Sequence, residues 1–151
     1  MSNVYLGLGT NLGDKVANLR AAVSQIEEKI GKVVSLSSFY ETAPWGFASE
    51  HTFLNAAACV DTSLSPLEVL RCTQEIERRL GRTEKSEGGV YHDRIIDIDL
   101  LLYNKVVMHT PELVLPHPLM LERDFVMKPL VEIAPNVIHP VLGKKLSECI
   151  K

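Results

Sequence analysis

Hydrophobic and polar residues alternate at the start of the chain and then change to a helical spacing. Val4, Leu6 and Leu8 occupy alternate positions, which predicts a short β-strand with one apolar face. After a short turn, apolar residues recur at spacings of three and four and predict one face of a helix, namely Val16, Leu19, Val23, Ile26 and Ile30. Asp14 is placed to cap this helix and Gly31 to end it.

The same two patterns continue along the chain. Three further strands are predicted at 33–42, 53–61 and 95–103, and loops at 43–52 and 82–93. A second helix is predicted to begin at the capping box Ser65-Pro66-Leu67-Glu68 and to end at Gly81. Its inward residues are Leu70, Thr73, Ile76 and Leu80.

The last part of the chain contains many prolines. Asn104-Lys105 predicts a hairpin turn into 106–108, and short helices are predicted around 119–130 and 144–150. The order β-α-β-β-α-β predicts a single α+β domain over 1–151, ferredoxin-like, with an antiparallel sheet and both helices on one face. The other face is then left for chemistry or for the C-terminal extension.

Composition narrows the class of protein. The 151 residues carry a formal net charge of -3, which argues against a general nucleic-acid binder. No apolar run reaches the 18 residues of a membrane span, and the N-terminus lacks the charge pattern of a signal peptide. The three cysteines form no CxxC pair, so neither a disulfide framework nor a zinc site is expected. We expect a cytoplasmic protein.

Two aspartates in the fourth predicted strand are the sharpest chemical feature. Alternation puts Ile96, Ile98, Leu100 and Leu102 on the core face. Asp97 and Asp99 then share the opposite face, about 6.6 Å apart along the strand, and repel by about 2.5 kcal/mol at an effective dielectric near 20. Either this face is solvated or it binds a hard cation, and Mg²⁺ favours one or two carboxylates together with phosphates and water.

Several other side chains are candidates for contacts with an anionic ligand. Arg82, Arg94 and Arg123 could bind phosphate oxygens with paired hydrogen bonds, whereas Lys85 is better interpreted as a solubilising charge. His117 lies between two prolines in a rigid turn. Trp45, in a predicted loop, either anchors that loop or stacks on a ligand.

Six segments along the chain carry a family resemblance, namely Gly7–Gly13, Tyr40–Gly46, Phe53–Ala57, Gln74–Arg82, Arg94–Tyr103 and Leu115–Phe125. In this order they resemble the 6-hydroxymethyl-7,8-dihydropterin pyrophosphokinase family of folate biosynthesis. The segment 83–93 departs from the family pattern, with Tyr91 near the place where many members have tryptophan.

The resemblance implies a magnesium-dependent transfer of diphosphate from ATP to the hydroxymethyl group of the pterin, leaving AMP. It implies two Mg²⁺ ions held by Asp97 and Asp99, with these aspartates, Arg94 and Arg123 as the catalytic set. The implied ATP contacts are Gln74, Glu77, Arg82, Arg94, His117 and Arg123. The pterin is expected near Gly9, Thr42, Pro44, Trp45, Phe53, Asn55, Asp97 and Phe125, stacked between aromatic rings.

Other functions remain open on the sequence alone. A ferredoxin-like binding module would consume no ATP, and a nucleotidyltransferase with the same carboxylates would release pyrophosphate. For the pyrophosphokinase we expect a monomer with no nucleic-acid or membrane partner, and lids formed by 43–52 and 83–93.

Overall fold

A computed structural model describes residues 1–42, 52–81 and 95–150 of the chain. The elements in chain order are β1 (Ser2–Thr10), α1 (Lys15–Lys29), β2 (Lys32–Leu36), β3 (Tyr40–Thr42), β4 (Phe53–Thr62), α2 (Pro66–Gly81), β5 (Asp97–Tyr103), β6 (Met108–His109), β7 (Val114–Leu115), the 3₁₀ helix η1 (Met120–Glu122), α3 (Asp124–Ile133) and α4 (Leu146–Cys149). The prediction of an α+β fold is confirmed.

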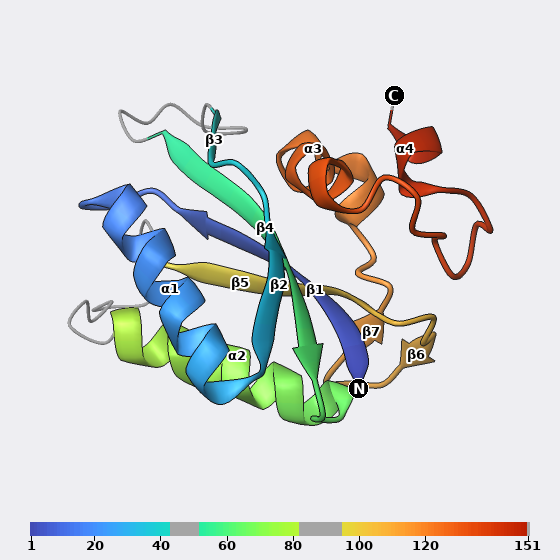
Figure 1. The fold of residues 1–151 in the computed structure, drawn as a ribbon, viewed down its shortest axis with the longest axis horizontal. Helices are drawn as coiled ribbons and strands as arrows, with labels where there is room; N and C mark the ends of the chain where they lie inside the picture. Colours follow the sequence, from blue (N-terminus) through green and yellow to red (C-terminus); the bar gives the residue numbers. More distant parts are fainter. Residues whose placement is uncertain (43–51, 82–94, 151) are drawn as a thin grey trace.

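The central sheet is antiparallel, with the strand order β2-β4-β1-β5 (Figure 1). β1 pairs with β4 along its whole length, from Ser2 opposite Thr62 to Thr10 opposite Leu54. β3 also pairs with β4, next to the end that begins at Phe53. A second, two-stranded sheet joins β6 to β7.

The two faces of the central sheet carry separate cores. On one face α1 and α2 cover a cluster built around Leu6, Ile26, Val60, Ile76 and Leu100. On the other face α3 and α4 pack over a second cluster, which includes Tyr5, Cys59, Leu101, Met127 and Leu146. The C-terminal segment therefore covers part of the face that the two long helices leave open, and the rest of that face is accessible to a ligand.

The predicted helix boundaries are confirmed. The side chain of Asp14 accepts the N–H of Ala17 at 3.1 Å, and α1 ends just before Gly31. A Cβ atom at Gly31 would collide with the backbone oxygen of Asp61, so only glycine fits there. Of the residues predicted to form one face of this helix, Val16 lies at the first turn and is 44% exposed.

The capping box of α2 is present as predicted. The N–H of Ser65 donates to the Glu68 carboxylate at 2.9 Å, and the N–H of Glu68 donates to the Ser65 hydroxyl at 3.3 Å. Thr73 and Ile76 are buried, while Leu70 and Leu80 pack at the edge of the same core.

The strand predicted at 33–42 is two strands. Ser37 separates them: its N–H donates to the Ala57 carbonyl at 2.9 Å, and its hydroxyl accepts the Ala57 N–H at 2.8 Å. The chain turns at this point, so that β4 pairs first with β3 and then with β2. The β-branched composition of the segment gives no sign of this break.

Leu102 lies on the opposite face from the one predicted. The pairing of β1 with β5 shifts between Tyr5 and Leu6, which leaves Leu101 as an extra residue in β5. Such a bulge reverses the side-chain alternation beyond it. Leu102 therefore packs under α3 with Leu101, whereas Ile96, Ile98 and Leu100 stay on the helix-covered face as predicted.

The turn predicted at Asn104-Lys105 is present, with the N–H of Val106 donating to the Tyr103 carbonyl at 3.0 Å, but it does not lead into a hairpin with β5. Asn104 turns the chain with a φ of 48°, and its side chain and N–H bond to the backbone of Asn3. The segment that follows pairs with Val114–Leu115 instead of returning along β5. The predicted tail helices correspond to η1, α3 and α4.

Cys59, Cys72 and Cys149 are free thiols. None of the helices among the described residues is both long and apolar enough to cross a bilayer.

Candidate active site

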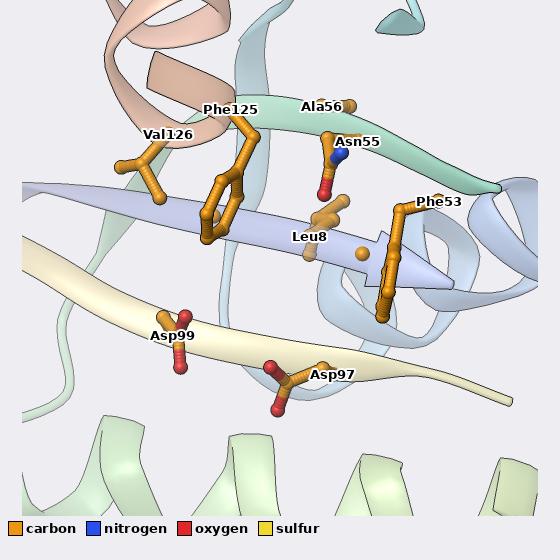
Figure 2. Close-up of a pocket in the computed structure, with 10 residues that line it drawn as sticks. Leu8, Phe53, Asn55, Ala56, Asp97, Asp99, Phe125 and Val126 are labelled. Atoms are coloured by element: carbon orange, nitrogen blue, oxygen red, sulfur yellow. The ribbon is translucent and has the colours of Figure 1, made fainter. Parts of the chain in front are cut away.

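A pocket opens between the exposed part of the sheet and the first turn of α3 (Figure 2). It is an open hollow with about 380 Å³ of empty space, part of which is open to solvent. Its lining residues are Gly7, Leu8, Gly9, Phe53, Asn55, Ala56, Asp97, Asp99, Phe125 and Val126.

One row of paired residues forms the floor of this pocket. Asp97 of β5 lies opposite Gly9 of β1, Gly9 lies opposite Asn55 of β4, and Asn55 lies opposite Tyr40 of β3. Directly paired residues project to the same side of a sheet, so this row places a carboxylate, an open position and a carboxamide in line. A Cβ atom at Gly9 would approach the Asn55 side-chain oxygen to 3.0 Å, so glycine keeps this part of the floor clear.

Asp99 extends the floor by one more position. It lies opposite Gly7, so both aspartates face strand positions without side chains. Figure 2 shows both carboxylates projecting from β5 to the same side. The predicted sharing of one face by Asp97 and Asp99 is confirmed, and both are half-buried in the pocket wall.

This arrangement fits a hard divalent cation. Carboxylate oxygens are the ligands that Mg²⁺ prefers, and it commonly binds one or two of them together with phosphate oxygens and water. Among the residues that the structure describes, no group of three or more acidic, histidine or cysteine side chains is placed to bind a metal. The two aspartates would leave the remaining coordination positions to phosphates and water.

Asn55 is held in place by β3. It is buried, and its side-chain nitrogen donates to the Thr42 hydroxyl at 2.9 Å. Thr42 is itself paired with Phe53 across the two strands. Figure 2 shows the rings of Phe53 and Phe125 projecting into the pocket on the two sides of Asn55. Two apolar ring faces flanking a carboxamide suit a planar ligand with hydrogen-bonding edges.

A basic and an imidazole side chain lie next to this pocket. The guanidinium carbon of Arg123 is 5.6 Å from the centre of the Phe125 ring, within range of a cation–π contact. The backbone N–H of His117 donates to the Leu101 carbonyl at 2.9 Å, and its Nδ1 accepts the N–H of Leu119 at 3.2 Å.

The surroundings of His117 lower the pKa of its imidazole. Burial lowers this pKa, the positive charge of Arg123 lowers it further, and Asp97 acts in the opposite direction. His117, Arg123 and Asp97 are thus electrostatic neighbours, although they come from three separate segments. A neutral imidazole with one N–H can donate a hydrogen bond to an anionic ligand.

The two predicted ATP contacts on α2, Glu77 and Gln74, differ in their surroundings. The carboxylate of Glu77 accepts the backbone N–H of Ile98 at 2.7 Å, so Glu77 lies at the outer edge of β5. Gln74 is exposed, one helical turn earlier. The structure therefore brings Glu77 into contact with the strand that carries both aspartates, whereas the Gln74 side chain is exposed.

Four of the predicted site residues, Pro44, Trp45, Arg82 and Arg94, lie outside the described residues. The same holds for Lys85, for Tyr91, and for the two segments predicted as lids, of which only Thr52 is described.

Three lining residues were missed by sequence reasoning, namely Leu8, Ala56 and Val126. Gly7 was not missed, because a glycine inside the first predicted strand is typical of a tightly packed or ligand-facing position, and it lies two residues before Gly9 on the same side of that strand. Val126 comes next to Phe125 at the start of α3, and only the packing of that helix places it in the pocket.

Comparison with known proteins gives a consistent result. The family model described as 7,8-dihydro-6-hydroxymethylpterin-pyrophosphokinase matches residues 5–135. A Porphyromonas gingivalis protein named 2-amino-4-hydroxy-6-hydroxymethyldihydropteridine pyrophosphokinase is 54% identical over 143 residues, covering 93% of this chain and 95% of its own. A protein of the same name from Aquifex aeolicus is 43% identical over 148 residues, covering 98% and 90%.

Solved structures show the same fold at much lower identity. The crystal structure of Plasmodium falciparum HPPK-DHPS superposes with a TM-score of 0.79 at 18% identity. This chain is covered to 98% in that superposition but spans only 43% of the Plasmodium chain. The match to the family model and the two close relatives establish that the chain belongs to the 7,8-dihydro-6-hydroxymethylpterin pyrophosphokinase family.

Proposed function

We propose that this chain transfers diphosphate from ATP to the hydroxymethyl group of 6-hydroxymethyl-7,8-dihydropterin and thereby serves folate biosynthesis. The products are AMP and the pterin diphosphate. Relatives that carry the pyrophosphokinase name match it over almost their whole length, which supports the same activity here. The observation that carries the proposal is the placement of Asp97 and Asp99 opposite two glycines, beside a slot flanked by two phenylalanine rings.

The pterin would occupy the slot between Phe53 and Phe125. A flat bicyclic ring stacks well on aromatic side chains, and its polar edge needs donors and acceptors. Asn55 is buried at this position, and its side-chain oxygen is oriented by the bond that its nitrogen makes to Thr42. Thr42 and Gly9 would then border the ring without contributing bulk.

The triphosphate would lie along β5 and reach Arg123. Asp97 and Asp99 would hold Mg²⁺, two ions in our proposal, and the metal would supply charge neutralisation and a template for the phosphates. Arg123 can donate paired hydrogen bonds to phosphate oxygens, and His117 can donate one. Arg94, Arg82, Gln74 and Glu77 complete the proposed ATP contacts, and Pro44 and Trp45 the proposed pterin contacts.

The reaction needs no protein nucleophile. The pterin hydroxyl oxygen forms a bond to the β-phosphorus, the bond from that phosphorus to the α-phosphate oxygen breaks, and the hydroxyl proton passes to solvent. The protein contributes by placing the acceptor oxygen in line with the leaving oxygen and by stabilising the charge that moves to the α-phosphate. Asp97 borders both the pterin slot and the proposed phosphate path, so it lies where the two substrates must meet.

The proposal extends to the fold type, the oligomeric state and the location of the protein. The strand order β2-β4-β1-β5, with α1 and α2 on one face, supports a single ferredoxin-like domain followed by a C-terminal extension. We propose that it acts as a monomer in the cytoplasm, where ATP is available.

Analysis of the products tests the proposed function. The purified chain is incubated with ATP, Mg²⁺ and the dihydropterin, and the products are identified by ³¹P NMR and mass spectrometry. We expect AMP and pterin diphosphate in equal amounts. Release of ADP would indicate transfer of one phosphoryl group, and release of pyrophosphate would indicate a nucleotidyltransferase. An unchanged ATP pool would indicate a binding module.

A further inference from the structure

One carboxylate ties α3 to the chain between β2 and β3. Glu132, in the last turn of α3, accepts the backbone N–H of Ser38 at 3.0 Å on each of its two oxygens. It also accepts the Ser38 hydroxyl at 3.1 Å and the Tyr40 hydroxyl at 2.6 Å. These partners are more than ninety residues away in the sequence, so the contact is tertiary rather than local.

Of the two segments that Glu132 joins, α3 lines the pocket and β3 supports the pocket floor. α3 carries Phe125 in its first turn, and Glu132 follows seven residues later. Seven residues are close to two helical turns, so both side chains project from the same side of α3 toward the sheet.

On the other side, β3 supports the floor of the pocket. Tyr40 is paired with Asn55, and Thr42 accepts the hydrogen bond that orients the Asn55 carboxamide. Tyr40 therefore stands in the same cross-strand row as Asn55, Gly9 and Asp97. A displacement of Glu132 relative to Tyr40 would change the distance between the Phe125 wall and the Asn55 floor.

The contact is made by an ionised group. The Tyr40 hydroxyl is the main cause that holds the pKa of Glu132 below its usual value, and the Ser38 N–H acts in the same direction. The pKa of Tyr40 is raised by the same bond. Hydrogen bonds to a charged acceptor are shorter and stronger than neutral ones, and the 2.6 Å distance is typical of them. These groups are exposed, so the strength of the hydrogen bond depends on the alignment of its donor and acceptor and not on burial.

We infer that Glu132 is a positioning residue for the pterin, which fixes the width of the slot between Phe125 and Asn55. The inference rests on the proposed function, because it takes the planar ligand of this slot to be the pterin. Glu132 itself does not line the pocket and touches no reacting atom. Its effect is transmitted through α3 on one side and through Tyr40 and β3 on the other.

Steady-state kinetics of matched variants test this. Glu132→Ala removes all the acceptors, Glu132→Gln keeps one side-chain oxygen, and Tyr40→Phe removes a single donor. Glu28→Gln on α1 is the matched control, because it removes an exposed carboxylate from the far face of the sheet. We expect the KM for pterin to rise about three- to tenfold in Glu132→Ala, with kcat and the KM for ATP within about twofold of wild type. The KM for pterin of Glu132→Gln should lie between those of wild type and Glu132→Ala. Adding Tyr40→Phe to Glu132→Ala should change this KM little further.

A binding measurement without ATP separates positioning from general destabilisation. Pterin fluorescence titrated against each folded variant should report the same three- to tenfold loss of affinity, at temperatures well below the unfolding transition. An unchanged affinity, or a loss of kcat and of both KM values in parallel with a loss of folded protein, would overturn the inference. If the wild-type chain releases no AMP while Glu132→Ala still weakens pterin binding, the proposed reaction fails and the positioning role stands.

Discussion

The carboxylate of Glu77 accepts the backbone N–H of Ile98 at 2.7 Å, at the peptide that lies between Asp97 and Asp99. β5 is the edge strand of the described sheet and this N–H points away from β1, so its acceptor comes from outside the sheet. α2 supplies it from the neighbouring helix. The two aspartates are therefore held from both sides, by pairing with β1 and by a contact to α2.

Loss of this acceptor should destabilise the fold. Ile98 is buried, and an N–H left without a partner in such a place costs about 1–3 kcal/mol. We expect Glu77→Ala to lower the free energy of unfolding by that amount in urea denaturation. Glu77→Gln keeps a side-chain oxygen and should lose less. Equal stability of Glu77→Ala and wild type would show that Ile98 is satisfied in another way.

The fold was largely predictable where local chemistry determines it. The alternation of Val4, Leu6 and Leu8 placed β1, and the Ser65–Glu68 box placed the start of α2, because both signals depend on neighbouring residues only. The bulge at Leu101 and the break at Ser37 were not predictable. Both depend on how a strand meets its partner, which the sequence of the strand alone does not contain.

The candidate site also combines features that the local sequence predicts with features that depend on tertiary packing. The shared face of Asp97 and Asp99 followed from strand alternation, and it is confirmed. The proximity of His117 to Arg123 and Asp97 has no local sequence signal, since the C-terminal segment must first pack against the sheet. The contact from Glu132 to Tyr40 joins residues 92 positions apart, and it also has no local sequence signal.

Replacement of either pocket aspartate should separate activity from stability. Asp97→Asn and Asp99→Asn each replace a proposed anionic metal ligand with a neutral side chain of the same shape, so turnover with Mg²⁺ should fall at least about a hundredfold. The free energy of unfolding should change by no more than about 2.5 kcal/mol, because relief of the like-charge repulsion of about 0.6–2.5 kcal/mol offsets what the carboxylate loses.

The control for these variants is Asp61→Asn, at the other end of β4 from Phe53 and Asn55. It should retain wild-type turnover. Near-normal turnover in Asp97→Asn and Asp99→Asn as well would show that these two carboxylates are only solvated surface charges.

Arg123 should not be replaceable by lysine. Its guanidinium lies over Phe125 and can follow the charge that moves to the leaving phosphate with paired hydrogen bonds, which an ammonium does less well. We expect Arg123→Ala to lose roughly 10²–10³-fold in kcat, and Arg123→Lys to regain only part of it. Wild-type kcat in Arg123→Ala with a modest rise in the KM for ATP would reduce this arginine to ground-state binding.

His139 should make the fold sensitive to mild acid. It is buried, and its Nδ1 accepts the N–H groups of Val141 at 3.2 Å and Leu142 at 3.1 Å, so the folded state requires this nitrogen unprotonated. Burial lowers the pKa of His139 below 6.5. The unfolded chain therefore binds a proton below about pH 6.5 that the folded chain does not, and stability should fall as the pH drops from there toward the lowered pKa.

Unfolding of His139→Asn as a function of pH checks this effect. Asparagine keeps an acceptor without titrating, so the loss of stability between pH 7 and pH 5 should be smaller than in wild type. The exposed His109 provides the control, and His109→Asn should follow the wild-type curve. A His139→Asn curve that is parallel to that of wild type would refute the assignment.

The most direct measurement is a crystal structure of the chain with Mg²⁺, a non-hydrolysable ATP analogue and the dihydropterin. We predict the pterin between Phe53 and Phe125, metal ions on Asp97 and Asp99, and the pterin hydroxyl oxygen about 3–3.5 Å from the β-phosphorus and in line with the leaving oxygen. A pterin bound outside this slot, or metal ions bound away from both aspartates, would contradict the account.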